Sequence, residues 1–338
     1  MEYRYIGKTG LRVSPICLGT MTFGNHCDKK TAFTLLDLAY DSGVNFFDTA
    51  EIYPVPPQSK TVGLTEEIVG EWMKTKARGS LILATKVTGG ASGWFVPPVR
   101  HGLTAVDAFH IKKAVEDSLR HLQTDYIDLY QMHWPDTIVP REESMKAFDA
   151  LVREGKVRYL GTSNDSTYGT MKSNMVSQFR GWARFESIQN NFSLLNRRFL
   201  DEMKDMCRQE SLSLLPYSPM AGGVLSGKYN LQLDAPGRFS RYARADEPRV
   251  RAMAHRFLNE KTLASTARYM EIAQSIDLMP ATLAIAWSKQ FDFVASTIVG
   301  ATAPAQLEES LAAMDLTLDE ETLKRCDEVH CDILYPMG

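Results

Sequence analysis

The sequence predicts a single (β/α)8 TIM barrel domain, with an N-terminal β-hairpin and long loops after strands three and seven. Strand and helix patterns alternate along the chain, which is typical of the α/β class. The strand segments are continuous apolar runs, as expected of parallel strands that are buried on both faces. Eight such units follow one another without a linker, which favours a closed barrel. The domain is expected to span 1–338, with the hairpin at about 1–12 and a C-terminal tail at about 315–338.

Each element is predicted from its pattern of residues. Lys8-Thr9-Gly10 is a turn signal between two β-like pieces. Helices are predicted where apolar residues recur at three- and four-residue spacing, and the first of them ends before Gly43. The predicted strands are 13–18, 44–48, 81–86, 127–133, 157–162, 186–190, 212–217 and 293–299. The predicted helices are 29–42, 64–74, 106–122, 142–154, 167–179, 199–211, 262–276, 281–289 and 305–313.

A doubly wound open sheet is the competing fold. That fold usually shows Gly-x-Gly-x-x-Gly after its first strand, and the stretch 19–24 reads Gly-Thr-Met-Thr-Phe-Gly, which does not match. Two connections, 87–105 and 218–259, are longer than a barrel requires. Both follow the C-terminal end of a strand, which is the face where barrels carry their sites.

Composition and charge exclude several functions. The chain has 338 residues and a formal net charge of −3, so neither nucleic acid nor an anionic membrane is an indicated partner. We find no apolar run near the roughly 20 residues that span a bilayer, and the polar N-terminus does not resemble a signal peptide. Five scattered cysteines without Cys-x-x-Cys indicate neither disulfides nor a metal site, and favour a cytoplasmic location.

Three consecutive predicted strands end in ionisable residues, namely Asp48, Lys86 and His133, and Tyr53 follows the first of them. In a barrel these strand ends share one face, so we expect the four side chains to lie together. A nearby ammonium lowers the pKa of a phenol from about 10 and makes it a better proton donor. A carboxylate would keep the lysine charged, and an imidazole could orient a carbonyl oxygen. The sequence therefore predicts a proton-handling site.

Motifs along nearly the whole chain resemble those of the aldo-keto reductases, most closely the family's bacterial Tas-like branch. They stand in the family's order: Asp48-Thr49-Ala50-Glu51-Ile52-Tyr53, Ala84-Thr85-Lys86-Val87, Tyr130-Gln131-Met132-His133-Trp134, Gly161-Thr162-Ser163-Asn164, Gln189-Asn190, Tyr217-Ser218-Pro219-Met220 and Val299-Gly300-Ala301-Thr302.

The resemblance implies an oxidoreductase that transfers hydride from NADPH to an aldehyde or ketone and releases an alcohol. Tyr53 would be the general acid, Lys86 and Asp48 its tuning pair, and His133 the group that orients the carbonyl. Family members specialised in reducing steroid double bonds replace that histidine, and this chain keeps it. Two alternatives are a catalytically weak, NADPH-binding regulatory or interaction subunit, and a phosphate-sugar aldolase or isomerase.

The resemblance also implies a cofactor site. Asn164 and Gln189 would bind the nicotinamide carboxamide with Ser163, because amides offer both a donor and an acceptor, and Tyr217 would stack on the ring. The complete implied set is Gly19, Thr20, Met21, Ser163, Asn164, Gln189, Tyr217, Ser218, Pro219, Met220, Gly222, Lys228, Arg238, Arg241, Gly300, Thr302, Gln306, Glu309 and Ser310.

Many family members carry a basic residue at the position of Gln306 and use it to bind the 2′-phosphate of NADPH. This chain lacks that charge, but Phe239-Ser240-Arg241 resembles an arginine-bearing loop of the potassium-channel β-subunit branch, and Arg238 and Arg244 add positive charge nearby. NADPH is therefore the expected cofactor and NADH the alternative. Aromatic residues in loops after the strands predict a pocket for hydrophobic carbonyl compounds, lined by Met21, Trp94, Phe95 and Trp134.

Overall fold

Eight parallel strands form the centre of the fold, in the order β10-β3-β4-β5-β6-β7-β8-β9. The structure is a computed structural model that describes residues 2–90 and 98–337. Just before β10, Val294 pairs with Leu214 of β9, and the N–H of Ala295 donates to the Leu214 carbonyl at 3.1 Å, which closes the barrel. The strands are β3 Ile16–Gly19, β4 Phe46–Asp48, β5 Ile82–Val87, β6 Ile127–Met132, β7 Val157–Ser163, β8 Phe185–Gln189, β9 Ser213–Leu214 and β10 Thr297–Val299.

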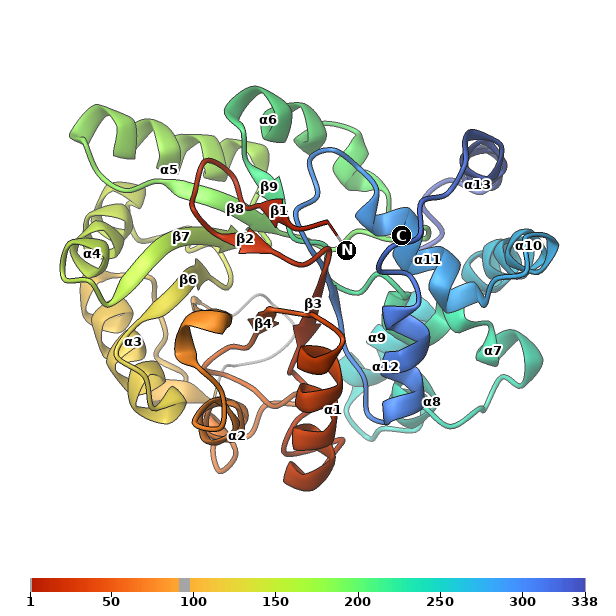
Figure 1. Ribbon diagram of the computed structural model, residues 1–338, viewed down its shortest axis with the longest axis horizontal. Coiled ribbons are helices and arrows are strands. Elements are labelled where there is room, and N and C mark those ends of the chain that lie inside the picture. The colour runs from red at the N-terminus through yellow and green to blue at the C-terminus, as the bar shows by residue number, and fades with distance from the viewer. Residues whose placement is uncertain (1, 91–97, 338) are drawn as a thin grey trace.

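Helices surround this barrel, as the (β/α)8 prediction requires (Figure 1). Their apolar faces pack against the outer side of the strands and form the larger hydrophobic core. The helices of this ring and its C-terminal end are α1 Lys29–Asp41, α2 Leu64–Met73, α3 Ala108–Leu122, α4 Arg141–Arg153, α5 Thr167–Arg180, α6 Met203–Glu210, α10 Glu260–Ser275, α11 Pro280–Lys289, α12 Pro304–Leu311 and α13 Glu320–Asp332.

The predicted N-terminal hairpin is present and lies across one end of the barrel (Figure 1). It consists of β1 (Arg4–Tyr5) and β2 (Arg12–Val13). Its Ile6 and Leu11 side chains are fully buried and join the smaller core inside the barrel. Because the hairpin seals this end, the site predicted at the strands' C-terminal ends lies at the opposite mouth.

Several predicted strands are longer than the structure shows, and the difference is largest for the last two along the chain. The segment 212–217 contributes only β9, because Pro216 has no N–H to donate to the ladder. The segment 293–299 contributes only β10, since Val294 and Ala295 cross to pair with β9.

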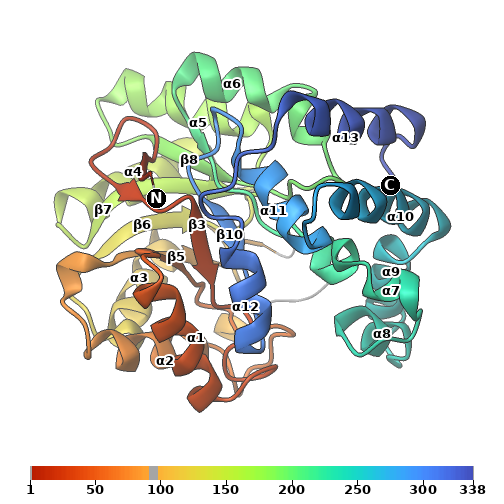
Figure 2. The same ribbon diagram turned by 45° about the vertical axis from the view of Figure 1, so that its right-hand side comes forward.

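Two regions predicted without helices contain them. The connection after β9 carries α7 (Lys228–Leu231), α8 (Arg238–Ala243) and α9 (Pro248–Phe257), and Figure 2 shows them grouped beside α10. The C-terminal tail carries α13, whose N-cap Asp319 accepts from the Thr322 N–H. Two helix-start signals were readable in the sequence, Pro248 at the first position of α9 and Asp319 at the N-cap of α13. Within residues 2–90 and 98–337, none of the helices is both long and apolar enough to cross a membrane.

Lys289, at the end of α11, gives a prediction about stability. Its side chain is buried, and Nζ donates to the Leu316 carbonyl at 2.6 Å. Burial and the nearby Arg4 lower its pKa from 10.5 to about 8. Between pH 8 and pH 10.5, Lys289 therefore binds more protons in the unfolded chain than in the folded chain. The free energy of unfolding should therefore gain about 2 kcal/mol from this residue as the pH rises from 8 to 10.5.

Urea denaturation of wild type and Lys289→Met across that pH range measures this contribution. The variant should lack the gain, whereas Lys261→Met, at an exposed position on α10, should keep it. Parallel pH profiles for wild type and Lys289→Met would contradict the assignment.

Candidate active site

The C-terminal ends of the barrel strands open into a cleft of about 2000 Å³. This volume exceeds the roughly 300–1,000 Å³ of a site for one drug-sized ligand. Its walls come from the loop after β3, the ends of β4, β6, β7, β8 and β10, and the helices between β9 and α10. The cleft can therefore hold an extended ligand with a smaller molecule beside it.

A buried ion pair lies at the floor of this mouth. Strands β4 and β5 pair Asp48 with Ala84, which places the Lys86 side chain against the Asp48 carboxylate. Lys86 Nζ donates to Asp48 Oδ1 at 2.5 Å and to the Thr49 carbonyl at 2.7 Å. Burial disfavours the ammonium, but Asp48 and Tyr53 outweigh it and raise the pKa of Lys86. The lysine is therefore a fixed positive charge.

Tyr53 lies above this pair in the loop after β4. Lys86 Nζ is 5.2 Å from the centroid of the Tyr53 ring, and only 9% of the tyrosine is exposed. Lys86 lowers the pKa of Tyr53, as expected, but burial has the larger effect, and the net pKa is raised. The prediction of a lowered pKa is therefore wrong in its net direction. Tyr53 carries its proton at neutral pH, as a proton donor must.

His133 forms the neighbouring part of the same floor. Its ring meets the Tyr53 ring edge to face, with centroids 5.8 Å apart, and stacks on Trp134 at 3.7 Å. Burial and the charge of Lys86 hold the pKa of His133 well below its usual value. The imidazole is therefore neutral at pH 7, and a neutral imidazole can donate one hydrogen bond.

Gln131 is a site residue that the sequence reasoning missed. Its Nε2 donates to Asp48 Oδ2 at 3.0 Å, and Gln189 Nε2 donates to the same oxygen at 2.9 Å. Together with Lys86, these amides fix the orientation of the carboxylate. The strand register is the feature that could have revealed Gln131. This residue lies beside Lys86 in the β5–β6 ladder and two residues before His133.

The residues predicted to bind a nicotinamide form one network next to His133. Tyr217 donates from its hydroxyl to Asn164 Oδ1 at 2.8 Å, and Asn164 Nδ2 donates to the His133 carbonyl at 2.9 Å. Ser163 Oγ donates to the Gln189 carbonyl at 2.8 Å. The ends of β6, β7, β8 and β9 thus hold a row of amide, hydroxyl and phenol groups along the cleft.

Most predicted residues line this cleft. Lys86 lies beneath its floor, and Ser310 is buried on α12, where its hydroxyl donates to the Gln306 carbonyl at 2.9 Å. Trp94 and Phe95 lie outside the described residues. The predicted residues found in the lining are Asp48, Tyr53, His133, Trp134, Gly19, Thr20, Met21, Ser163, Asn164, Gln189, Tyr217, Ser218, Pro219, Met220, Gly222, Lys228, Arg238, Arg241, Gly300, Thr302, Gln306 and Glu309.

Three cations gather on the wall formed by α7 and α8. Burial lowers the pKa of Lys228, and the charges of Arg238 and Arg241 lower it further. In the part of the chain that the structure describes, no carboxylate forms an ion pair with any of the three, although Arg244 pairs with Asp234 at 3.6 Å. Uncompensated positive charge in a cleft favours an anionic ligand. We find no cluster of metal-binding side chains among the described residues.

A (β/α)8 barrel with tyrosine, lysine, aspartate and histidine at the mouth is the framework of a class of oxidoreductases. The aldo/keto reductase family model matches residues 15–330, and the chain belongs to this family.

Three relatives show how the chain is placed within the family. Protein Tas of Escherichia coli (strain K12) is 37% identical over 364 residues, which cover 99% of each chain. Norsolorinic acid reductase A of Aspergillus parasiticus is 32% identical and covers 98% of this chain and 81% of its own. A probable voltage-gated potassium channel subunit beta of Oryza sativa subsp. japonica is 33% identical, covering 94% of this chain and 92% of its own. Both predicted branches are thus represented.

Proposed function

We propose that this protein reduces the carbonyl group of an aldehyde or ketone to an alcohol, with NADPH as the reductant. The buried Lys86–Asp48 pair carries the proposal, because it lies beneath a protonated tyrosine and beside a neutral histidine. Asp48, Tyr53 and His133 line a cleft that is large enough for a dinucleotide and a substrate, and Lys86 lies beneath its floor.

The side chains divide the chemistry among them. A bound NADPH would supply the hydride. The Tyr53 hydroxyl would give its proton to the carbonyl oxygen, and the Lys86 ammonium would stabilise the phenolate left behind. His133 would donate a hydrogen bond to the same oxygen and fix its position. Asp48 keeps Lys86 charged and in place through the 2.5 Å contact.

The cleft fits the proposed cofactor. Asn164, Ser163 and Gln189 line the cleft and carry the donor and acceptor groups that a carboxamide requires, and in this structure those groups bond to one another and to neighbouring residues. The turn after β9 approaches the cleft through Gly222, which has φ +65° and leaves no room for a Cβ, since Phe239 would lie 2.5 Å from it. Lys228, Arg238 and Arg241 supply positive charge for phosphates.

Arg241 supports a preference for NADPH over NADH, because its charge would face the 2′-phosphate. Gln306 cannot supply that charge, and its Oε1 already accepts from the Thr302 N–H at 2.9 Å. Arg241→Ala should raise KM for NADPH by about 10- to 100-fold, the loss expected for a charge-assisted contact. KM for NADH should change by less than about threefold.

Steady-state kinetics with both cofactors measures this effect. The matched control is Arg120→Ala, since Arg120 is exposed on α3 and lies outside the cleft lining. Equal changes in KM for NADPH and NADH would contradict the assignment of Arg241.

The substrate end of the cleft favours hydrophobic carbonyl compounds. Among the described residues at this end, Asp136 is the one carboxylate apart from Asp48. The backbone N–H groups of Val106, Ile138 and Val139 already donate hydrogen bonds to it. The Aspergillus relative, norsolorinic acid reductase A, is likewise named as a reductase. The apolar lining consists of Met21, Ile52, Val55, Pro57, Trp134, Ile138 and Val139.

A panel of aldehydes and ketones, assayed with NADPH and NADH, tests the proposed function. Aromatic aldehydes should give the highest kcat/KM, and charged sugars the lowest. The potassium channel relative favours a second candidate, a catalytically weak NADPH-binding subunit. Tight NADPH binding with negligible turnover across the panel would favour that second function.

A further inference from the structure

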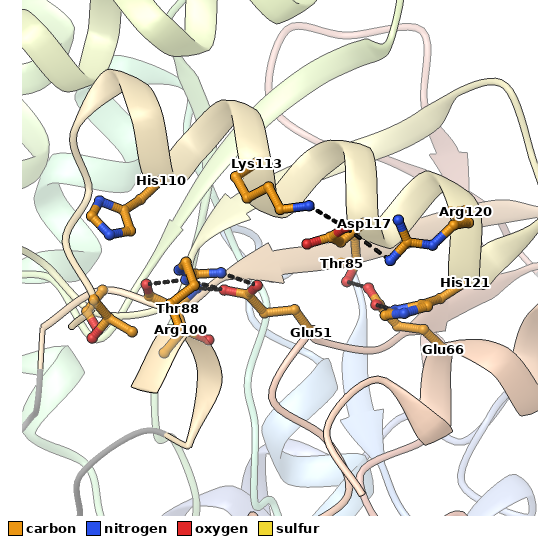
Figure 3. A network of polar contacts seen from close by, with 12 residues as sticks. Glu51, Glu66, Thr85, Thr88, Arg100, His110, Lys113, Asp117, Arg120 and His121 are labelled. Carbon is orange, nitrogen blue, oxygen red and sulfur yellow. Dashed lines mark hydrogen bonds and ion pairs between the residues drawn. The ribbon is translucent and has the colours of Figure 1, made fainter. Parts of the chain in front are cut away.

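A second buried ion pair lies directly behind the loop that carries Tyr53. Glu51, two residues before Tyr53, is 5% exposed. Its Oε2 accepts from Arg100 Nη1 at 2.7 Å, and its Oε1 accepts from Arg100 Nη2 at 2.9 Å (Figure 3). The same Oε1 accepts from the backbone N–H of Thr88 at 2.5 Å. Both carboxylate oxygens are therefore occupied, and the arginine binds them as a fork.

These contacts join the Tyr53 loop to the strand that carries Lys86. Thr88 lies two residues after Lys86, and Arg100 Nη2 also donates to its carbonyl at 3.3 Å. The backbone N–H of Glu51 donates to the Lys86 carbonyl at 3.3 Å. Glu51 therefore connects the loop that carries Tyr53 to the strand that carries Lys86, through both its main chain and its side chain.

Tyr53 is held from its other side as well. The N–H of Val55 donates to the Met21 carbonyl at 3.1 Å, in the loop after β3. The N–H of Gly63 donates to the Glu51 carbonyl at 3.0 Å. Tyr53 thus lies midway between two anchored residues, and Glu51 is the anchor on the side of Lys86.

The conformation of Arg100 supports a specific role for this pair. Arg100 has φ 47° and His101 has φ 56°, so two consecutive residues other than glycine adopt the left-handed region. Such backbone strain persists only where surrounding contacts determine it, and it clusters at functional sites. The guanidinium is also mostly buried, with 15% of its side chain exposed, so the contact differs from an ordinary surface ion pair.

We propose that Glu51 and Arg100 are positioning residues that hold the Tyr53 hydroxyl in register with Lys86 for proton transfer. This inference rests on the proposed carbonyl reduction. Neither residue lines the cleft, so neither touches substrate or cofactor. Their effect is geometric, and a displacement of about 1 Å in a reacting group can reduce turnover by about 100-fold.

Glu51→Gln tests the proposal with little change in shape. The glutamine can still accept from Thr88, but it loses the charge that orders Arg100. We expect kcat for an aromatic aldehyde to fall by about 10- to 100-fold, while the Kd for NADPH stays within about twofold. The alkaline limb of the kcat profile should also move to higher pH, because a tyrosine displaced from Lys86 loses the effect that lowers its pKa. Arg100→Lys gives a second test that keeps the charge but loses the fork.

A carboxylate of the neighbouring strand β6, at the opposite end of the barrel, offers a control. There, Asp128 Oδ2 accepts from Arg78 Nη2 at 2.7 Å and from the Leu83 N–H of β5 at 3.0 Å. Asp128 Oδ1 also accepts from Arg158 Nη1 at 2.6 Å, so Asp128→Asn weakens buried ion pairs at the end of the barrel opposite the cleft. It should lower the melting temperature and leave kcat and its pH profile unchanged.

The two proposals can fail separately. If Glu51→Gln and Arg100→Lys only lower the melting temperature, as Asp128→Asn does, the positioning role is wrong and carbonyl reduction stands. If wild type turns over no carbonyl compound at all, the proposed function itself fails. A failure of Glu51→Gln to fold leaves Arg100→Lys to decide between the first two outcomes.

Discussion

Tyr53→Phe should lower kcat for carbonyl reduction by about 10²–10⁴-fold, the range that general acid catalysis contributes. The substitution removes one hydroxyl and keeps the ring that packs against His133. The Kd for NADPH should therefore change by less than about twofold. Stopped-flow measurement of aldehyde reduction, with fluorescence titration of NADPH, separates the two effects.

Tyr130→Phe is the matched control for this experiment. The Tyr130 hydroxyl is buried and has no hydrogen-bond partner among the described residues, and Tyr130 is absent from the cleft lining. Its removal should leave kcat unchanged. Full turnover in Tyr53→Phe would refute the role of Tyr53 as proton donor.

Lys86→Met should affect both stability and activity. Removing the lysine leaves the buried Asp48 carboxylate with the amides of Gln131 and Gln189 as its side-chain donors among the described residues. Breaking a buried pair in this way costs roughly 3–5 kcal/mol of unfolding free energy. The kcat should fall by about 10²–10³-fold, as expected when one electrostatic partner is removed from a buried site.

The double variant Asp48→Asn/Lys86→Met separates these two effects. It removes both charges, so urea denaturation should show part of the lost stability restored relative to Lys86→Met. Its kcat should stay as low as that of the single variant. A double variant that regains activity would show that Lys86 acts only in stability.

The fold was predictable because each strand–helix unit repeats the same pattern. Buried parallel strands produce apolar runs, and the C-terminal strand ends of a barrel share one face. Those two rules bring together Asp48, Lys86 and His133, which are separated by 85 positions in the numbering from first to last. Helices α7 and α8 were missed because they have only 4 and 6 residues, too few to show a periodic pattern, whereas α9 has 10 residues and was missed although Pro248 marks its start.

Other parts of the site depend on side-chain packing that a sequence pattern does not contain. The net pKa of Tyr53 depends on the balance between burial and Lys86, and burial prevails. The Glu51–Arg100 pair joins residues from two irregular loops, where no periodicity sets the register. Ser310 faces its own helix because its hydroxyl bonds to the Gln306 carbonyl.

Product analysis of a single turnover tests the central claim most directly. Wild-type enzyme with one equivalent of NADPH is mixed with excess aromatic aldehyde, and the alcohol and the oxidised cofactor are both quantified. We expect one alcohol for each NADPH oxidised. NADPH that stays bound and unoxidised, with no alcohol formed from any aldehyde or ketone of the panel, would contradict the account.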